Sequence, residues 1–549
     1  MKRILLAAAV LAAVLAGTFF AIGGREGVML LVLPWMTPDV APHREVAWTP
    51  GPDAAPTGDR PPNVVVILAD DLGFNDVSFY GGGVAGGTVP TPNIDSIGRD
   101  GVNFTSAYAG NATCSPSRAA IMTGRYGTRF GFEFTGVPVE FAQMVGHFDP
   151  DTPIRPIYHA DREAEVPPYQ DQGLPTSEIT IARLLSKAGY RTLHLGKWHL
   201  GESPQFTPQA HGFDESLGFY SGASLFLKKD DPDVVNSMQD FDPIDKFLWA
   251  ALPYGVHFNG GELFEPKGYM TDYLTDEAIK AIDANRNRPF FMYLAYNAPH
   301  TPLQATREDY EALSHIEDHT MRVYAAMIRS LDRNVGRVLE ALKERGLDEN
   351  TLVVFTSDNG GAHYIGLDDL NKPYRGWKAT FYEGGIRVPF FMRWPGRIPA
   401  GSTYAAPISH FDIFATAAGA AGQPVPDDRV IDGVDLMPFL TGAAAGRPHD
   451  RLFWRSGPYW VVQSGNWKLQ VTAHPEAVRL YDLDTDPGER DDLAASRKDK
   501  VAELRAMLDA FEKEQAKPLW PSLVEAPITL DQPLNRPWHD GEAYIYWSN

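Results

Sequence analysis

The sequence predicts an α/β protein with a large, mostly parallel sheet between layers of helices and a smaller C-terminal α+β domain that contains an antiparallel sheet. Short apolar runs alternate with helical patterns along most of the chain, and this pattern changes after about Val425. The chain has 549 residues, of which 44% are hydrophobic and 11% aromatic, so it can build one large core and one smaller core.

Four runs rich in β-branched and apolar residues are typical of strands buried on both faces. They are residues 64–68, 191–195, 290–296 and 352–355. Two amphipathic patterns, over residues 176–188 and 321–345, indicate helices that end at Gly189 and Gly346. Strands that alternate with helices predict a parallel sheet covered on both faces.

The C-terminal part of the chain shows shorter elements. Residues 451–462, 467–471 and 478–483 are typical of strands, and residues 498–513 of a helix. We therefore expect a main domain over residues 63–424, a small α+β domain over 425–517 and a tail over 518–549 that wraps over the surface. Residues 37–62 are rich in Pro, Ala and Gly, which predicts a linker.

The N-terminus has the pattern of an export signal. Lys2 and Arg3 precede an apolar run over residues 4–22. A second apolar patch follows at residues 28–35, so an uncleaved membrane anchor is the alternative for residues 1–36. Both interpretations predict an exported protein, located in the periplasm or outside the cell.

The charge of the chain narrows the class of partner. Lys and Arg number 49 and Asp and Glu number 70, which gives a formal net charge of −21. A chain this acidic is not expected to bind nucleic acid in general, because the phosphate backbone would be repelled. An anionic small substrate is still compatible with a local cationic pocket.

Polar side chains follow each of the four predicted strands. In chain order they are Asp70, Asp71, Lys197, His199, His300, Asp358 and Asn359. Because ligands of open α/β sheets bind beyond the carboxyl ends of the strands, we expect these groups to share one edge. The Asp and Asn oxygens favour a hard divalent cation, and calcium tolerates irregular oxygen cages better than magnesium, whereas zinc usually recruits His or Cys.

Cys114 is the only cysteine of the chain. A lone cysteine is either a buried small hydrophobe or a reactive group. Pro116 suits the first turn of a helix, which predicts a helix that starts near Pro116 or Ser117. Cys114 would then lie at a helix N-terminus that favours negative charge, and Arg118 on the same face could hold an oxyanion.

The segment T-C-S-P-S-R-A-A-I-M-T-G-R, residues 113–125, resembles the signature of type I sulfatases in the alkaline-phosphatase-like superfamily. Other segments resemble the same family: N-V-V-V-I-L-A-D-D-L-G, G-K-W-H-L-G, N-A-P-H-T-P, S-D-N-G-G, W-K-A-T-F-Y-E-G-G-I-R-V-P and L-Y-D-L-D-T-D-P-G-E-R-D-D-L-A. The resemblance covers about residues 63–493. It implies the fold of that superfamily, with residues 63–424 as the catalytic sulfatase domain.

The resemblance also implies a modified residue and a metal ion. A formylglycine-generating enzyme would oxidise Cys114 to Cα-formylglycine. One Ca²⁺ would be held by Asp70, Asp71, Asp358 and Asn359, with the modified Cys114 facing the ion as a further ligand. The substrate would be a sulfate ester, cleaved to an alcohol and inorganic sulfate.

The resemblance implies roles for the remaining polar residues. Lys197 and Arg118 would stabilise the hydrate of formylglycine, and His199 would assist the release of sulfate. His300 and Lys378 would bind the sulfate and help to protonate the leaving oxygen. The chemistry is consistent, because a hydrated aldehyde offers one hydroxyl to attack sulfur and a second whose deprotonation expels sulfate.

Two other functions stay open. One is a phosphonate monoester or phosphodiester hydrolase of the same superfamily. The other is a catalytically inactive binding homologue, whose site would be damaged, whereas every expected position is present here. A sulfated carbohydrate is the first expectation for the substrate, with aryl and steroid sulfates as alternatives. Residues 130–175 and 224–266 form long insertions that either set specificity or decorate the surface.

Overall fold

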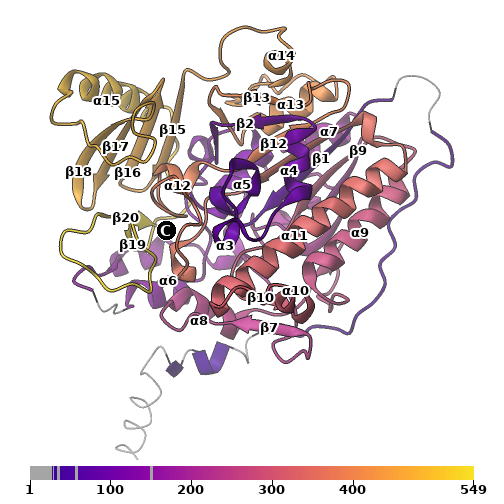
Figure 1. Ribbon diagram of the computed structural model, residues 1–549, viewed down its shortest axis with the longest axis horizontal. Coiled ribbons are helices and arrows are strands. Elements are labelled where there is room, and N and C mark those ends of the chain that lie inside the picture. Colours follow the sequence, from indigo (N-terminus) through magenta and orange to yellow (C-terminus); the bar gives the residue numbers. More distant parts are fainter. Residues whose placement is uncertain (1–26, 29, 34–36, 56–59, 149–151) are drawn as a thin grey trace, which may run out of the picture.

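The computed structural model describes residues 27–28, 30–33, 37–55, 60–148 and 152–549. Its centre is a mixed nine-stranded sheet in the order β13-β2-β12-β11-β1-β9-β5-β6-β8, with helices on both faces (Figure 1). A separate four-stranded sheet, β15-β16-β17-β18, belongs to the C-terminal part of the chain. This architecture is the fold class that the sequence predicts.

Four parallel strands form the middle of the large sheet, namely β11 (Thr351–Ser357), β1 (Asn63–Ala69), β9 (Phe290–Ala295) and β5 (Arg191–Lys197). Asn63 lies opposite Thr351 and Arg191 lies opposite Phe290, so the carboxyl ends of all four strands reach the same edge. All residues of β1, β9 and β11 are buried, which is why their sequences are continuous apolar runs. The four predicted strands are confirmed.

The outer strands of the large sheet are shorter. β6 (Glu215–Phe219) is parallel to β5, and β8 (His257–Phe258) is antiparallel to β6. On the other side lie β12 (Phe390–Arg393), antiparallel to β11, then β2 (Val102–Phe104) and β13 (Ser402–Tyr404). The sheet is therefore parallel at its centre and mixed at its margins.

Successive residues of β1 point into two different apolar layers. Val65 and Ile67 belong to the layer that contains α4 (Pro92–Arg99), α9 (Met270–Asn285) and α11 (His319–Glu344). Val64 and Val66 belong to the layer of α5 (Cys114–Thr123), α7 (Ile181–Lys187) and α13 (Asp412–Ala420). In Figure 1, α9 and α11 run side by side across one face of the sheet.

The two predicted helices differ from the structure at their starts. α11 begins two residues earlier than predicted, because the Asp318 side chain caps it by accepting a hydrogen bond from the backbone N–H of Met321 at 2.8 Å. The predicted start of the other helix at residue 176 is wrong. The Thr180 side chain caps α7 by accepting from the backbone N–H of Arg183, so residues 176–180 lie outside the helix.

The C-terminal domain is an antiparallel meander covered by one helix. It consists of β15 (Arg451–Ser456), β16 (Tyr459–Ser464), β17 (Trp467–Ala473), β18 (Glu476–Asp482) and α15 (Lys498–Glu512). The prediction of one strand over residues 451–462 is wrong, because Gly457 has a φ of +54° and, with Pro458, turns the chain between β15 and β16. The α+β character of the domain is as predicted.

Both ends of the described chain pack into the fold. The tail forms β19 (Val524–Thr529) and β20 (Tyr544–Ser548), and β19 pairs both with β20 and with β4 (Ile157–Tyr158). In the segment expected as a linker, Ala41 pairs with Phe264, and the buried Trp48 ring donates a hydrogen bond to Glu277 at 2.9 Å. Residues 37–55 thus lie along the main domain as a strap.

The two insertions each contribute a helix. The first contains α6 (Val139–Gly146) and β4, and the second contains β7 (Val234–Ser237) and α8 (Pro243–Ala251). β7 pairs with β10 (Leu303–Thr306). The remaining short elements are β3 (Ala107–Tyr108), β14 (Ile408–Ser409), α3 (Val84–Gly87), α10 (Arg307–Glu311), α12 (Glu383–Ile386) and α14 (Met437–Leu440).

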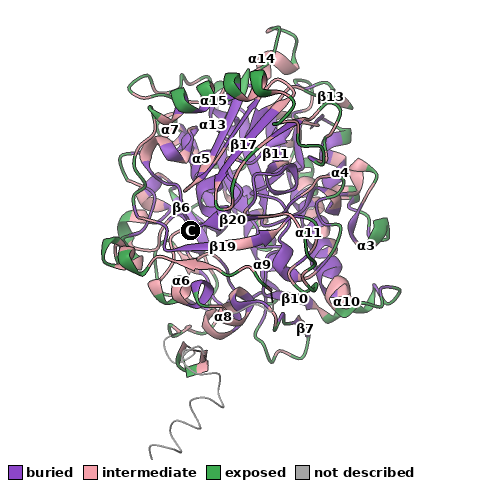
Figure 2. Cartoon of the chain, turned by 90° about the vertical axis from the view of Figure 1, so that its left-hand side faces the viewer, coloured by how far each residue is buried: buried purple, intermediate pink, exposed green. Residues whose placement is uncertain are grey.

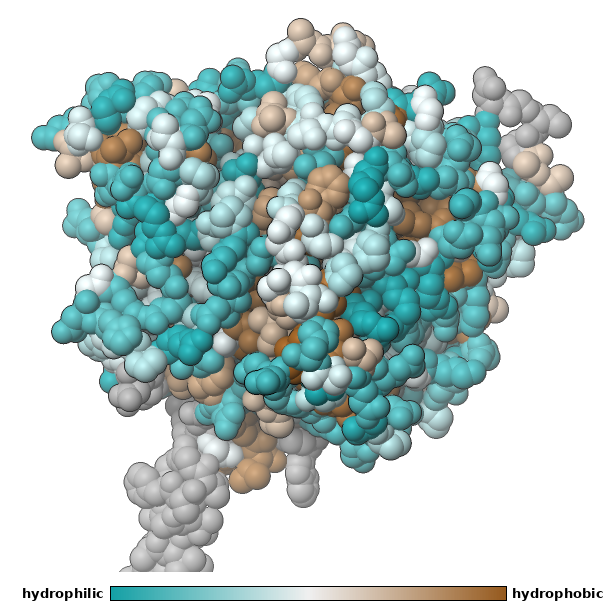
Figure 3. Space-filling view, in the orientation of Figure 1, coloured by the Kyte–Doolittle hydropathy of each residue, from teal (hydrophilic) through white to brown (hydrophobic). Residues whose placement is uncertain are grey.

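Buried residues fill the two sheets, whereas exposed residues gather on outer elements such as α3 and α15 (Figure 2). The face seen in Figure 3 is largely hydrophilic, with hydrophobic residues in separate areas. Among the described residues no helix is long and apolar enough to cross a membrane. The proposed signal or anchor over residues 1–36 falls mostly outside the described residues.

Candidate active site

The predicted polar residues converge at the carboxyl edge of the central strands. Asp70 and Asp71 follow β1, Lys197 ends β5, and Asp358 follows β11. Asp71 and His199 have positive φ angles of 62° and 58°, an uncommon backbone conformation for residues other than glycine. This backbone turns the side chains that follow the strands back toward one another.

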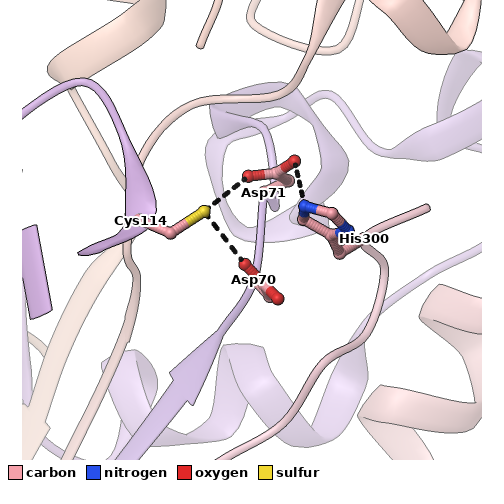
Figure 4. A group of neighbouring side chains, drawn as sticks. All are labelled: Asp70, Asp71, Cys114 and His300. Atoms are coloured by element: carbon pink, nitrogen blue, oxygen red, sulfur yellow. Dashed lines mark hydrogen bonds and ion pairs between the residues drawn. The ribbon is translucent and has the colours of Figure 1, made fainter. Parts of the chain in front are cut away.

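Cys114 is the first residue of α5, and the helix starts two residues earlier than predicted. Its N-cap, Thr113, makes no side-chain hydrogen bond to the helix, so backbone N–H groups of the first turn face the site. The thiol Sγ lies 3.5 Å from Asp70 Oδ1 and 3.7 Å from Asp71 Oδ1 (Figure 4). Burial, followed by the nearby Asp358 carboxylate, raises the pKa of the Cys114 thiol.

Two fully buried cations lie beneath the carboxylates. Lys197 Nζ lies 2.9 and 2.8 Å from the two oxygens of Asp70. Arg118 binds Asp358 Oδ2 through Nε at 2.9 Å and Nη2 at 2.8 Å, and Nη2 also lies 3.4 Å from Asp70 Oδ1. Arg118 and Lys197 do not line the cavity described below, so they act on the carboxylates from behind.

A second cationic group surrounds Asp71 on the cavity side. Lys378 Nζ lies 2.8 Å from Asp71 Oδ2 and 3.3 Å from His300 Nε2. Tyr364 Oη donates to the same Asp71 oxygen at 3.1 Å and accepts from Lys378 Nζ at 2.9 Å. Sequence reasoning did not identify Tyr364. The only available signal was its place six residues after Asp358 in S-D-N-G-G-A-H-Y.

The two carboxylates nearest Cys114 differ in acidity. Burial raises the pKa of Asp70 to about 7, although Lys197 opposes this effect. Burial acts in the same direction on Asp71, but Lys378, His300 and Lys197 outweigh it and hold the pKa of Asp71 below its usual range. The site therefore separates one readily ionised carboxylate from one that is harder to ionise without a further cation.

His199 and His300 both line the cavity. The backbone carbonyl of His199 accepts a hydrogen bond from Ser115 Oγ at 2.7 Å, while the ring Nδ1 of His199 has no partner among the described residues. Burial lowers the pKa of His199 well below its usual value, and burial lowers the pKa of His300 to about 3. Burial therefore favours the uncharged form of each ring. His194 is fully buried beside Trp198.

The oxygen donors fit a hard cation. Asp358 Oδ1 accepts from the backbone N–H of Asp71 at 3.2 Å, and Asn359 Nδ2 donates to Asp71 Oδ1 at 2.7 Å. Asn359 Oδ1 is buried and has no hydrogen-bond partner among the described residues, an arrangement that a metal ligand would explain. Asp70, Asp71, Cys114 and His300 each offer one possible metal-ligand atom, and these four atoms lie within 4.8 Å of one another (Figure 4).

A cavity of about 560 Å³ opens above these groups. Cys114, His199, His300 and Lys378 line its floor. Its walls come from α6 and its flanks, from α8, and from the tail strands β19 and β20. The two insertions, expected either to set specificity or to decorate the surface, and the tail, expected to wrap over the surface, thus meet over the site.

Comparisons with known proteins agree over most of the chain. Residues 62–423 match the family model described as Sulfatase, and residues 375–516 match the one described as N-sulphoglucosamine sulphohydrolase, C-terminal. The N-acetylgalactosamine-6-sulfatase of Mus musculus is 34% identical over 439 residues, which cover 78% of this chain and 76% of the relative. The steryl-sulfatase of Mus musculus is 32% identical over 577 residues, which cover 86% and 85%.

A solved structure extends the likeness to three dimensions. Ps i-CgsB in complex with k-i-k-neocarrahexaose is 32% identical to this chain with a TM-score of 0.69, and the match covers 84% of this chain and 95% of that one. The stretch matched by the first family model contains every candidate site residue, from Asp70 to Lys378.

Proposed function

The chain belongs to the sulfatase family of sulfuric ester hydrolases, and from this we propose that it cleaves a sulfate ester with a formylglycine made from Cys114 and a bound Ca²⁺. The observation that carries the proposal is the position of Cys114. It starts a helix, it points at Asp70 and Asp71, and it lies on the floor of the cavity. A structural thiol needs none of these three features.

Calcium suits the charges and donor atoms of the site. Asp70, Asp71, Asp358 and Asn359 would hold the ion, and the unpaired Asn359 oxygen supports this assignment. The one soft donor is the sulfur of Cys114, and its oxidation would leave an all-oxygen set. When bound, the ion would neutralise the sulfuryl oxygens and the nucleophile.

Charge balance explains why a cation is needed. Three buried carboxylates face three cationic side chains. The carboxylates are Asp70, Asp71 and Asp358, and the cations are Arg118, Lys197 and Lys378. Without a metal the cluster is close to neutral and offers an anionic sulfate ester little attraction. A divalent ion would give the site the net positive charge that an anionic substrate and its transition state require.

We assign the remaining roles by position. Arg118 and Lys197 would hold the carboxylates and stabilise the nucleophile from behind. Lys378 and His300, which line the cavity together, would bind the sulfate and deliver a proton to the leaving oxygen. His199, which also lines the cavity, would assist sulfate release. When present, formylglycine would supply a hydrated aldehyde as the nucleophile.

Maturation and export belong to the same proposal. C-S-P-S-R at residues 114–118 would be read by a formylglycine-generating enzyme, so activity would depend on the host that makes the protein. The basic pair Lys2 and Arg3 and the apolar run behind it support export, either to the periplasm or outside the cell, with a retained N-terminal anchor as the alternative.

The names of the relatives indicate two kinds of substrate. One relative is named for a sulfated amino sugar and another for a sterol sulfate, at nearly the same identity to this chain. Either a sulfated carbohydrate or an aryl or steroid sulfate is therefore compatible with the family. The second candidate reaction is phosphonate monoester or phosphodiester hydrolysis, for which the oxygen-rich site would also suffice.

The proposal is tested by comparing 4-nitrophenyl sulfate with an aryl phosphonate monoester, using protein from a host that makes formylglycine. We expect faster turnover of the sulfate, and an aldehyde at residue 114 by peptide mass spectrometry. Cys114→Ala should abolish turnover while its unfolding transition stays close to that of the parent protein. Faster phosphonate turnover, or undiminished activity of Cys114→Ala, would refute the assignment.

A further inference from the structure

The cavity above Cys114 has an apolar upper wall. α6 contributes Phe141 and Val145, α8 contributes Phe247 and Leu248, and the tail contributes Ile528 and Trp547. Phe141 and Phe247 meet edge to face at 5.1 Å between their ring centres, which joins the two insertions above the floor. Three segments distant in sequence therefore supply apolar side chains to one surface.

Several of these side chains are only partly covered by protein. Phe141, Phe247 and Leu248 are half-buried, and the surface they leave open faces the cavity. Apolar surface that stays in contact with water costs free energy, which an apolar ligand would recover by covering it. The wall therefore favours a ligand that brings apolar surface of its own.

Several polar side chains of the upper wall are already hydrogen-bonded within the protein. Both carboxylate oxygens of Asp242 accept from backbone N–H groups at the start of α8, at 3.1 and 2.9 Å. The Asn549 amide bonds the backbone N–H and C=O of Thr135 at 2.8 and 3.2 Å. Hydroxyls that donate to backbone carbonyls belong to Thr152, Ser221 and Thr529.

A sugar ring would find few partners here. Each of its hydroxyls must exchange hydrogen bonds with water for hydrogen bonds with protein, and an unpaired hydroxyl in an apolar wall is costly. Two further polar side chains belong to the lining: Glu202 accepts a hydrogen bond from Tyr169 Oη at 2.8 Å, and His363 Nδ1 has no partner among the described residues. On the floor, His300 and Lys378 face the sulfate position. The site is thus built to bind one polar end and one apolar body.

The charges along the wall also favour a ligand with one charged end and an apolar body. Among the described residues, Lys378 is the only Lys or Arg that lines the cavity, and it lies at the sulfate end. The first insertion carries His159 and Arg162, but His159 pairs with Glu525 and Arg162 donates to the backbone carbonyl of Ser522. A polyanionic sulfated glycan would need further cations along its length, and this wall provides none.

We infer that the substrate is the sulfate ester of an apolar alcohol or phenol whose carbon skeleton is covered by α6, α8 and the tail. This rests on the sulfatase activity proposed above and names the class of its leaving group. Ligand cavities of about 300–1,000 Å³ hold molecules of several rings, so a cavity of about 560 Å³ fits a polycyclic or extended alicyclic skeleton.

The test compares two primary sulfate esters that differ chiefly in polarity, cyclohexylmethyl sulfate and galactose 6-sulfate. Both leave as a primary alcohol with a six-membered ring one carbon away, so intrinsic reactivity is similar. We expect kcat/KM to favour cyclohexylmethyl sulfate by roughly a hundred-fold or more, since a largely apolar wall leaves most of the sugar hydroxyls without partners. Equal or faster turnover of galactose 6-sulfate would overturn the inference and leave the sulfatase activity intact.

Variants of α8 connect the preference to the wall. Leu248→Gln should lower the ratio of the two kcat/KM values roughly ten-fold. If this variant folds poorly, the same ratio is measured for Ile244→Gln, which changes another cavity-lining residue of the same helix. Leu519→Gln makes the same change at an exposed position that does not line the cavity, and it should leave the ratio unaltered. An unchanged ratio in both folded α8 variants would refute the role of the wall.

Binding separates this inference from catalysis. In the Cys114→Ala protein, calorimetry should show that cyclohexylmethyl sulfate binds with a negative heat-capacity change and galactose 6-sulfate binds more weakly. If neither ester nor 4-nitrophenyl sulfate is turned over by matured parent protein, the sulfatase proposal itself fails. If turnover is normal but the sugar ester binds more tightly, only the apolar assignment fails.

Discussion

At the scale of single residues, Asn359 is the best indicator of a metal. Its Nδ2 donates hydrogen bonds to Asp71 Oδ1 and to the backbone carbonyl of Gly360, while its Oδ1 has no partner among the described residues. An unpaired buried oxygen costs about 1–3 kcal/mol, and a bound ligand or ion would remove that cost. The three carboxylates around it make a cation the simplest ligand.

Asn359→Ala should weaken calcium binding. In the parent protein, free Ca²⁺ at about a hundred times its Kd should raise the free energy of unfolding by about 2.7 kcal/mol, seen as a rise in Tm that a chelator reverses. The variant should show a clearly smaller rise at the same calcium concentration. Asn285→Ala is the control, because this buried asparagine of α9 bonds Ala281 and Arg288 far from the site. An equal calcium effect in Asn359→Ala would contradict the assignment.

Tyr364 connects Asp71 to Lys378 through one hydroxyl. Tyr364→Phe removes both hydrogen bonds and leaves the ring in place, so Lys378 loses one of the three groups that fix its position. We expect kcat/KM for an aryl sulfate to fall about ten-fold, equivalent to about 1.4 kcal/mol. Tyr190→Phe is the matched control, since among the described residues that hydroxyl is buried without a partner, near the opposite end of β5. Similar losses in both variants would mean that Tyr364 has no special role.

At the scale of elements, α5 matters most because it carries Cys114 at its first residue. Its end is fixed by Gly124, whose φ of +69° lets the backbone N–H bond Ala120 and stop the helix. A Cβ on Gly124 would lie 2.7 Å from Cγ of Phe414 in α13, the helix that packs beside α5. Both the backbone conformation and the space therefore require glycine.

Gly124→Ala should destabilise the protein by about 2–4 kcal/mol, because left-handed strain adds to the displacement of Phe414. Gly189→Ala separates the two causes. Gly189 follows α7 with a φ of +86°, but a Cβ there meets nothing within 4 Å, so its cost should be about 1–2 kcal/mol. Urea unfolding of both variants measures the difference. Equal costs would show that α13 yields without penalty.

Elements were predictable where the pattern is local. The central strands are buried on both faces, so their apolar runs are continuous, and the carboxyl-end rule then brought Asp70, Lys197 and Asp358 together. The break at Gly457 and the cap at Thr180 decided boundaries that periodicity alone does not reveal. Each depends on one residue's backbone conformation or side-chain bond.

The walls of the site were less predictable than its floor. The floor residues stand in motifs next to strands, but Phe141, Phe247 and Trp547 come from three separate segments. Nothing in the sequence near any of them indicates that they face one cavity. Their convergence depends on β19 pairing with β4 and on the contact between α6 and α8, which are both long-range.

At the scale of the whole molecule, the C-terminal sheet is joined to the main domain by an apolar cluster and by buried ion pairs. Leu469 and Leu480 of that sheet belong to the same cluster as the α9 and α11 layer. Lys468 Nζ lies 2.8 Å from Glu383 on α12 and 3.0 Å from Glu489, and Arg455 lies 2.6 Å from Glu133. The C-terminal domain is thus held partly by charges that are removed from water.

Lys468→Met tests how strongly this joint depends on charge. The substitution preserves the apolar stem of the side chain but leaves Glu383 and Glu489, both fully buried, facing each other without their shared cation. Removing one partner of a buried ionic network usually costs about 3–5 kcal/mol, and Arg387, 3.0 Å from Glu383, places this case toward the lower end. Urea denaturation should show the loss with the two domains unfolding together.

Adding Glu489→Gln to Lys468→Met should recover part of the stability, because it removes the uncompensated charge. Lys500→Met, at an exposed pair on α15, should change little. A loss no greater than that of the Lys500 control would mean that the charge of Lys468 contributes nothing to holding the domains together.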